Sequence, residues 1–193
     1  MTSYAPFSDA HGADGHAVRW STWNGEHHDT VSIRWENEGF TISGASTREA
    51  VEYVLRVSPT WQVRQFILFR DLEEPDLWLA TDGTGRWGEM NGAHRTELDG
   101  CYDIHLGCTP FTATLPIRRL PLLDGHTAEL PVVQIDTETL EVEPITVRYT
   151  RIDALHWRIE HPASGQQAEI DVEVEVDEHG VVVDYPGEFR RSS

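Results

Sequence analysis

Residues 145–160 read ITVRYTRIDALHWRIE, and apolar and polar side chains alternate along both halves of this stretch. Val147 and Tyr149 are flanked by polar residues in the first half, and Trp157 and Ile159 are flanked in the same way in the second. A period of two places one set of side chains on each face of a sheet. One dry and one wet face is typical of antiparallel sheets. The stretch therefore predicts strands of an antiparallel sheet.

The same alternation recurs outward from this stretch, at residues 31–36, 51–57 and 172–176. Asp82-Gly83-Thr84-Gly85 and Glu178-His179-Gly180 separate apolar runs and predict hairpin turns. Only one short helix is predicted: Thr109 caps it, Pro110 suits its first position and Pro116 ends it. The pattern predicts a mostly antiparallel β fold.

The run from Trp61 to Arg70 departs from clean alternation, because large apolar groups fall on both parities. Ile67 and Phe69 share one face, and Phe66 and Leu68 share the other. We expect a strand buried on both sides, as in a curved sheet that encloses a helix, a partner or a ligand. A central strand of a sandwich explains the pattern equally well.

The length of 193 residues fits one domain, and we expect a loose arm over residues 1–16 and a single β domain over residues 17–193. No run approaches the roughly 20 apolar residues of a membrane span. The polar N-terminus has no basic patch before an apolar stretch, so no secretory signal is predicted. We expect a cytoplasmic protein that does not insert into membranes.

The net charge is −18, from 15 basic and 33 acidic residues. Such an acidic protein repels phosphate backbones, so we do not expect nucleic acid as a partner. All 15 basic residues are Arg. The absence of Lys excludes Schiff-base chemistry and the phosphate-loop lysine. No cofactor is expected.

Cys101, His105 and Cys108 are soft donors within eight residues, and zinc accepts such ligands. On a strand, however, Cys101 and His105 share one face while Cys108 lies on the other, and no paired metal spacing is present. We expect no metal site and two buried, reduced thiols.

Two polar groupings suggest chemistry. Asp99, Asp103 and His105 share strand parity and could form an acid–base group, although a polar row facing water or a cavity explains them too. On an extended segment, Arg118 and Arg119 would point to opposite faces. The inward one would need a carboxylate partner or a polar ligand, because an unpaired buried charge is costly. Its candidate partners are Asp99, Asp103 and Asp184.

Linear motifs add a resemblance to a known family. They are Leu98–Leu106, the segment Cys108–Leu120 with its Thr-Pro-Phe-Thr core, Arg148-Tyr149-Thr150, and Asp184–Arg191. Together they resemble the bacterial and archaeal family called "putative glycolipid-binding", over roughly residues 17–191. The resemblance implies a fold similar to the bacterial lipoprotein carriers, an antiparallel sheet curled into an unclosed barrel around a short helical plug. It implies no catalytic residues.

We therefore predict a non-enzymatic binder of a glycolipid-like amphipathic molecule, with apolar tails on the concave side of the sheet. The seven Trp residues suit stacking on sugars or the mouth of an apolar pocket, and equally a plain core. One alternative is a cofactor-free isomerase or hydrolase that uses Asp103 and His105. Another is a protein-interaction module that uses the open sheet, for example as a homodimer. The predicted ligand-binding residues are Trp20, Trp61, Arg64, Asp99, Asp103, Thr109, Phe111, Thr112, Arg118, Arg119, Tyr149 and Tyr185.

Overall fold

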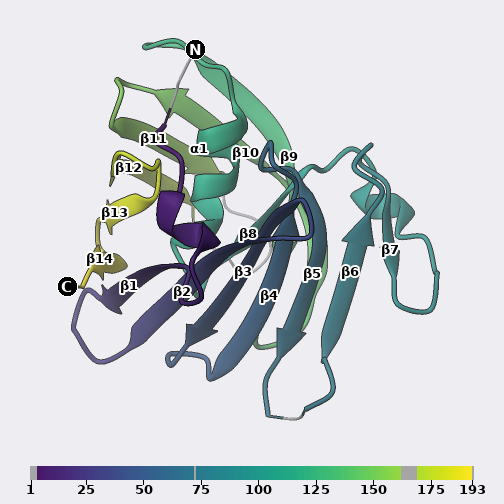
Figure 1. The fold of residues 1–193 in the computed structure, drawn as a ribbon. Coiled ribbons are helices and arrows are strands. Elements are labelled where there is room, and N and C mark those ends of the chain that lie inside the picture. The colour runs from purple at the N-terminus through teal and green to yellow at the C-terminus, as the bar shows by residue number, and fades with distance from the viewer. Residues whose placement is uncertain (1–3, 72, 162–168, 193) are drawn as a thin grey trace.

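The strands of the protein form one curled sheet (Figure 1), in a computed structural model that describes residues 4–71, 73–161 and 169–192. The strand order is β7-β6-β5-β4-β3-β2-β1-β14-β13-β12-β11-β10-β9-β8. Neighbouring strands are antiparallel except β8 and β9, which are parallel. Within the described residues, β7 and β8 end the order without pairing with each other, so the sheet is curled and unclosed.

The elements have the following bounds: η1 (Ser8–His11), β1 (His16–Thr22), β2 (His28–Glu36), β3 (Gly39–Ser46), β4 (Val51–Val57), β5 (Val63–Phe69), β6 (Leu77–Thr81), β7 (Trp87–Glu89), η2 (Thr96–Leu98), β8 (Asp103–Leu106), η3 (Phe111–Ala113), α1 (Thr114–Arg119), β9 (Thr127–Ile135), β10 (Val142–Arg151), β11 (His156–His161), β12 (Ile170–Val176), β13 (Val182–Tyr185) and β14 (Phe189–Arg191).

The predicted fold class is confirmed. The alternating runs became β2, β4, β10, β11 and β12, and their apolar parity is the buried one in β2, β4 and β10. Both predicted hairpin turns join neighbouring antiparallel strands. In the first turn, Gly83 and Gly85 have φ of 83° and 88°, which glycine adopts at little cost.

The prediction that the strand at 61–70 is buried on both sides is wrong. Phe66 and Leu68 are fully buried, but Ile67 and Phe69 are only half-buried. A register shift opposite Arg56 and Val57 places an extra residue in β5, so that Val63 joins the buried side despite its parity. One face of β5 is therefore the core face along its length.

The helical segment is longer than predicted, because Pro116 does not end it. η3 passes directly into α1, and Pro116 is the third residue of α1. In the first turn of a helix an N–H has no intrahelical acceptor, so proline is tolerated there. The predicted cap at Thr109 does form a bond: its Oγ1 accepts a hydrogen bond from the N–H of Phe111 at 3.1 Å.

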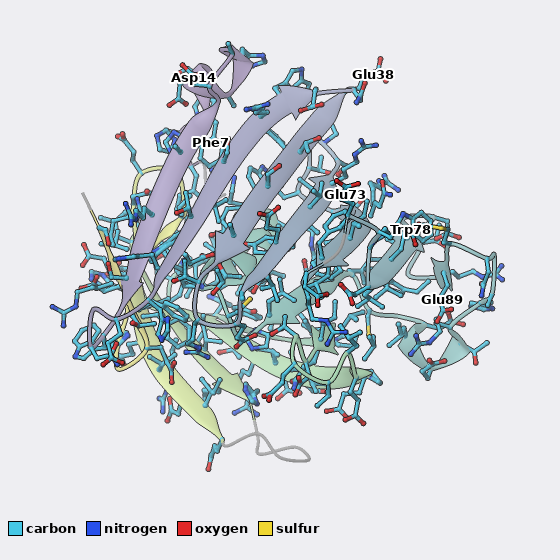
Figure 2. All side chains as sticks on the ribbon, turned by 90° about the horizontal axis from the view of Figure 1, so that it is seen from below. Phe7, Asp14, Glu38, Glu73, Trp78 and Glu89 are labelled. Atoms are coloured by element: carbon cyan, nitrogen blue, oxygen red, sulfur yellow. The ribbon has the colours of Figure 1, made fainter. Side chains whose placement is uncertain are left out.

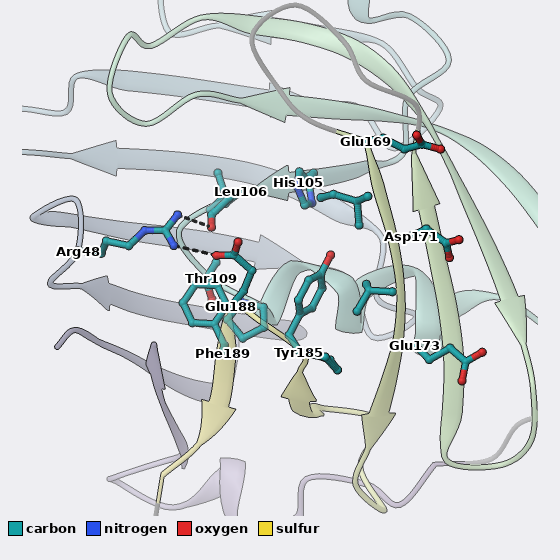
Figure 3. A pocket seen from close by; sticks show the side chains of 15 residues that line it. Arg48, His105, Leu106, Thr109, Glu169, Asp171, Glu173, Tyr185, Glu188 and Phe189 are labelled. Carbon is teal, nitrogen blue, oxygen red and sulfur yellow. Dashed lines mark hydrogen bonds and ion pairs between the residues drawn. The ribbon is translucent and has the colours of Figure 1, made fainter. Parts of the chain in front are cut away.

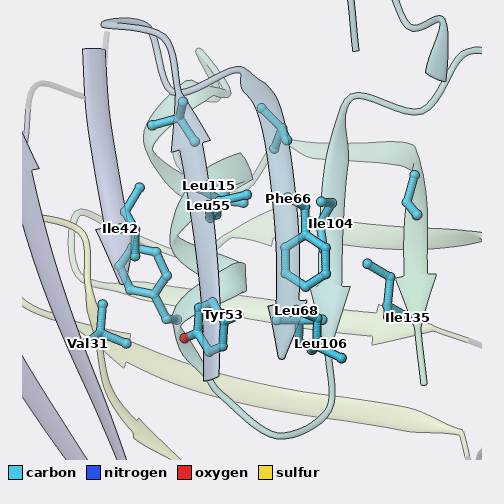
Figure 4. Packing of buried hydrophobic residues seen from close by; sticks show 14 of the residues in the cluster. Val31, Ile42, Tyr53, Leu55, Phe66, Leu68, Ile104, Leu106, Leu115 and Ile135 are labelled. Carbon is cyan, nitrogen blue, oxygen red and sulfur yellow. The ribbon is translucent and has the colours of Figure 1, made fainter. Parts of the chain in front are cut away.

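The inside of the curl is filled by the protein itself. α1 lies between the strands of the two halves of the sheet (Figure 1), and Phe111 of η3 and Leu115 and Ile117 of α1 are fully buried. Figure 4 shows side chains from β2 to β5, β8, β9 and α1 meeting in one apolar cluster. A second cluster around Trp157 packs on the other side of α1. The helical plug thus occupies the concave side on which we expected apolar tails of a ligand.

The N-terminal segment, for which we expected a loose arm, lies against the domain over its described residues. Phe7 and Ala10 are buried in the first cluster. Figure 2 places Phe7 at the same end of the sheet as Glu38 of the β2–β3 turn. Residues 4–11 therefore cover one end of the curl.

Candidate ligand-binding site

A cleft of about 760 Å³ opens where the sheet splits beside β12. Among the described residues, β13 pairs with β12 only at Glu175 and Val176, so the first half of β12 lacks a neighbour on that side. The other wall comes from the segment after β8 and from the β13–β14 turn. The cleft is lined by Arg48, His105, Leu106, Gly107, Thr109, Pro110, Glu169, Ile170, Asp171, Val172, Glu173, Tyr185, Pro186, Glu188 and Phe189.

The inner walls of the cleft are mostly apolar. Ile170 and Val172 on β12 and Tyr185 on β13 are half-buried and line it. Figure 3 shows the carboxylates of Asp171 and Glu173 on the side of β12 that faces away from Tyr185. This is the alternation of a strand, with the apolar set turned into the cleft.

An ion pair marks the mouth of the cleft. Arg48 Nη1 donates a hydrogen bond to Glu188 Oε2 at 3.1 Å, and its Nη2 donates to the carbonyl of Gly107 at 3.4 Å (Figure 3). Both side chains also line a neighbouring hollow of about 540 Å³, together with the exposed ring of Trp23. The Arg48–Glu188 pair therefore borders both hollows, and as a solvent-exposed ion pair it is weak.

His105 gives the cleft a polar inner end. Burial lowers the pKa of His105 to about 4, and the nearby His161 ring, 6.0 Å away between centroids, adds to this effect. The imidazole is therefore neutral at pH 7, with one donor and one acceptor nitrogen. Such a group can bind a hydroxyl but does not attract an anion.

A buried polar network lies directly behind the cleft wall at Thr109. The Thr109 hydroxyl donates to Asp29 Oδ2 on β2, and Tyr53 Oη on β4 donates to Thr109 Oγ1 at 3.3 Å. Asp29 is fully buried, and burial raises the pKa of its carboxyl to about 7 although the bond from Thr109 opposes the rise. The Tyr53 ring lies across Gly44, where a methyl group would overlap it.

A second buried acid is bonded to the last residue of α1. Asp103 on β8 accepts a hydrogen bond from Arg119 Nη2, and Asp103 is 1% exposed. Burial raises the pKa of the Asp103 carboxyl, and the Arg119 guanidinium opposes this rise. Tyr149 lies close to this pair, and burial and the Asp103 charge raise its pKa well above the ordinary value. The pair joins α1 to the sheet.

The model of a family described as "Putative glycolipid-binding" matches residues 17–191. The chain belongs to this family. It is also similar to a solved structure, a DUF1089 family protein from Pseudomonas aeruginosa, with 32% identity and a TM-score of 0.68. That alignment covers 89% of this chain and 92% of the other. No curated protein matches the sequence.

Two of the predicted ligand-binding residues, Thr109 and Tyr185, line the cleft in this family member. Others are core residues: Trp20, Phe111 and Thr112 are buried, and the Trp20 indole donates to the carbonyl of Val182 at 2.9 Å. The remaining ones lie elsewhere. Arg64 is exposed beside the β6–β7 turn, Asp99 is exposed after η2, Trp61 and Arg118 meet at the far end of α1, and Asp103, Arg119 and Tyr149 form the buried group described above.

Two predicted groupings are corrected by the structure. Arg118 and Arg119 lie in the last turn of α1 rather than on an extended segment, and neither is fully exposed. Asp99 bonds to His94 at 2.8 Å at the surface, so it does not join Asp103 and His105. Of the three proposed partners for an inward arginine, Asp103 is the one used, by Arg119.

Cys101 and Cys108 are buried, free thiols. Burial raises the pKa of Cys101 to about 11, and it raises that of Cys108 further. Within the described part of the chain, no three His, Cys, Asp or Glu side chains converge on a point that could hold a metal ion. In the same residues, no helix is long and apolar enough to cross a membrane.

Sequence reasoning missed Asp29, Arg48, Ile170 and Glu188. Asp29 carries a signal that was readable, since it shares the buried parity of Val31 on the same strand. An acidic residue on an apolar face needs an explanation. Nothing in the neighbouring sequence marks the other three as site residues. They line the cleft only because β13 pairs with part of β12, and this pairing is a long-range feature.

Proposed function

We propose that this protein binds a neutral, glycolipid-like amphipathic molecule in the cleft beside β12 and does not transform it. The observation that carries the proposal is the form of the cleft, an open space of about 760 Å³ with apolar walls and a charged mouth. This volume lies in the usual range of about 300–1,000 Å³ for small-molecule sites. The description of the family supports the same ligand class.

In this proposal, the apolar part of the ligand lies against Ile170, Val172 and Tyr185. The head group lies at the Arg48–Glu188 pair, next to the hollow that Trp23 lines. An exposed indole suits a sugar ring, because its face is apolar and its edge can bond to a hydroxyl. The neutral state of His105 favours hydroxyl groups over charged ones at the inner end.

The electrostatics favour a neutral head group. Glu169, Asp171, Glu173 and Glu188 all border the cleft, whereas Arg48 is its one cationic side chain among the described lining residues. The whole protein adds a net charge of −18. Anionic head groups are therefore disfavoured at this cleft.

The alternative of an acid–base enzyme gains no support from the geometry. Asp103 is bonded to Arg119, and the pKa of His105 is lowered to about 4, which makes it a weak base. The alternative of a protein-interaction module remains a prediction. Size-exclusion chromatography tests it by showing whether the protein forms a homodimer.

The test compares two neighbouring positions on β12. Val172→Trp fills the cleft, whereas Glu173→Gln changes a side chain at the edge of the cleft whose carboxylate lies on the side of β12 away from Tyr185 (Figure 3). Dodecyl maltoside, kept below its micelle concentration at about 100 times its Kd, should stabilise the wild type by roughly 2.7 kcal/mol and raise its Tm by several degrees. Glu173→Gln should keep this shift, and Val172→Trp should lose it.

Native mass spectrometry of the protein purified from its own host gives the natural ligand. A copurified molecule with a sugar or other neutral head and an apolar tail is the expected result. Equal stabilisation of wild type and Val172→Trp by the maltoside would remove the cleft from the proposal. No shift by any neutral amphiphile would remove the function itself.

A further inference from the structure

Among the residues that the structure describes, Arg118 is the one arginine that is shielded from solvent without an ion-pair partner. Among the described residues, every other arginine that is buried or half-buried forms an ion pair: Arg95 with Glu89, Arg119 with Asp103, Arg151 with Asp124, Arg158 with Asp171 and Arg191 with Asp177. Within the described part of the chain no such pair involves Arg118, although the sequence has 33 acidic residues against 15 basic ones. Asp177 acts on Arg118 through its charge but is paired with Arg191, so the Arg118 guanidinium has no carboxylate bonded to it.

The Arg118 guanidinium is instead surrounded by aromatic rings and backbone carbonyls. It lies 4.5 Å from the centroid of Trp61 and 4.8 Å from that of Phe7. Its Nη1 donates to the carbonyls of His179 and Ala5, the latter at 3.4 Å. Burial lowers the pKa of Arg118 to about 10, so the side chain stays charged at neutral pH. Its buried Nε, like those of Arg119 and Arg191, has no hydrogen-bond acceptor among the described residues.

An arginine in this state retains capacity for an anion. Guanidinium offers five N–H donors in a planar fork that matches a carboxylate or a phosphate. A neutral carbonyl satisfies it less well than an anionic oxygen does, and an uncompensated cation in a partly buried place is costly. The rings of Trp61 and Phe7 offset part of this cost through cation–π attraction.

The contacts of Arg118 with Ala5 and Phe7 come from the N-terminal segment. The Phe7 ring is stacked on His179 at 4.9 Å and lies 5.5 Å from Trp61 and 6.2 Å from Phe40. The segment is also fixed by a bond from Ala5 N to the carbonyl of Glu178 at 2.8 Å. The segment thus places a polar group, the Ala5 carbonyl, on the guanidinium and an apolar group, the Phe7 ring, among aromatic rings. An amphipathic molecule would present the same two groups, a polar head and an apolar body.

Trp61 adds a second observation at the same place. Its φ is 64°, a left-handed conformation that a bulky residue rarely adopts. Such strain persists only where the surroundings impose it, and it clusters at binding sites. Here the strained backbone holds the indole against both Arg118 and Phe40.

We propose that residues 4–7 are an internal occupant of a second binding site, which takes an amphipathic anion: a carboxylate or phosphate head joined to an apolar chain. The head would replace the Ala5 carbonyl on Arg118, and the chain would take the place of Phe7 among Trp61, Phe40 and His179. This site lies at the opposite end of the helical plug from the cleft, since Pro110, which lines the cleft, precedes η3 and Arg118 lies in the last turn of α1. It is independent of the proposed function.

The test weakens the binding of residues 4–7 to this site in the full-length protein. Phe7→Ala removes the ring that fills the site, and calorimetry then measures the binding of dodecanoate, dodecyl phosphate and dodecyl maltoside below their micelle concentrations. We expect Phe7→Ala to bind one or both anions at least about tenfold more tightly than the wild type. Comparison of the two anions distinguishes a carboxylate site from a phosphate site. The affinity for the maltoside should not change.

The cation is tested in the Phe7→Ala background. Arg118→Gln should lose at least about tenfold of the gained affinity, while Arg64→Gln, an exposed change of the same charge, should retain it. If Arg118→Gln does not fold, as judged by its melting curve, Arg118→Lys keeps the charge but removes the planar fork and should still weaken binding severalfold.

Three results would overturn the proposal. The first is equal anion affinity of wild type and Phe7→Ala. The second is equal affinity of the Arg118 and Arg64 variants. The third is an anion signal that disappears in Val172→Trp, because this would place the anion in the cleft instead.

Discussion

Two aspartates are buried on the inner side of the sheet, and they differ in what faces their carboxylates. Asp103 faces the guanidinium of Arg119, whereas Asp29 faces the hydroxyl of Thr109. Both are at most 1% exposed. A cation stabilises the ionised form directly, while a hydroxyl does so only weakly. Burial raises the pKa of both carboxyls, but a guanidinium opposes the rise at Asp103, whereas only a hydroxyl opposes it at Asp29, whose pKa reaches about 7.

The largest effect should come from removing the cation of the first pair. Arg119→Ala leaves Asp103 as an unpaired buried charge, and we expect a loss on the order of 3–5 kcal/mol in the free energy of unfolding. Urea denaturation at pH 7 measures it. The double variant Arg119→Met with Asp103→Leu should recover most of the loss, because no charge is then left without a partner. A loss below about 1 kcal/mol in the single variant would mean that Asp103 is neutral.

The second effect is pH-dependent and belongs to Asp29. Its pKa is raised to about 7 in the folded protein from 3.8, so the folded state holds a proton that the unfolded state releases above pH 4. Stability from this group is thus fully present below about pH 4 and falls as the pH rises toward 7. At 1.36 kcal/mol for each pKa unit, the whole change amounts to at most about 4 kcal/mol.

Asp29→Asn isolates this contribution, because the amide keeps the shape and cannot ionise. We expect the variant to be more stable than the wild type by roughly 2–4 kcal/mol at pH 8 and to lose that advantage by pH 4. Urea denaturation at several pH values gives the difference between the two proteins. A difference that does not depend on pH would show that Asp29 does not titrate in this range.

A smaller effect should follow from the hydroxyl that faces Asp29. Thr109→Val removes a donor to Asp29 and an acceptor for Tyr53 and for the N–H of Phe111. Buried polar groups that lose a partner cost about 1–3 kcal/mol, and we expect a loss in that range at pH 5. The apparent pKa of Asp29 should also rise. Thr112→Val, with a hydroxyl that accepts a single long bond from Leu106 N, is the matched control and should cost less.

The smallest effect should come from an aspartate that is not buried. Asp99 bonds to His94 at the surface, where both side chains are exposed. Asp99→Asn should change the free energy of unfolding by less than about 0.5 kcal/mol, as surface pairs usually do. Thermal melting at low and high salt is the measurement. A larger, salt-independent loss would mean that the η2 region is more shielded than its exposure indicates.

The sequence predicted the sheet well because alternation is a local property. Residues 145–150 and 31–36 carry their own side-chain period, and their strands formed as expected. The extra residue in β5 was not predictable in this way, because it depends on the register against Arg56 and Val57. Pro116 misled for a related reason: whether a proline ends a helix or fits its first turn depends on where the helix begins.

The candidate site was predicted far less well than the fold. Thr109 and Tyr185 line the cleft, but they come together only through long-range pairing of strands distant in sequence. Arg48 and Ile170, which also line it, look like ordinary surface residues in the sequence. The alternation along a strand predicts on which face of the sheet a side chain lies. It does not predict which neighbouring strands fail to pair and so leave a cleft.

The pairing of β1 with β14 also constrains the order of events during synthesis. Trp20 lies opposite Arg191, so the first strand finds one of its two neighbours only after some 170 further residues have been made. At about 5–20 residues per second, a ribosome needs on the order of ten to thirty seconds for that length. Until then β1 has an unpaired edge, which is the kind of surface that chaperones protect. The nascent chain thus completes its sheet only after its last strand has emerged from the ribosome.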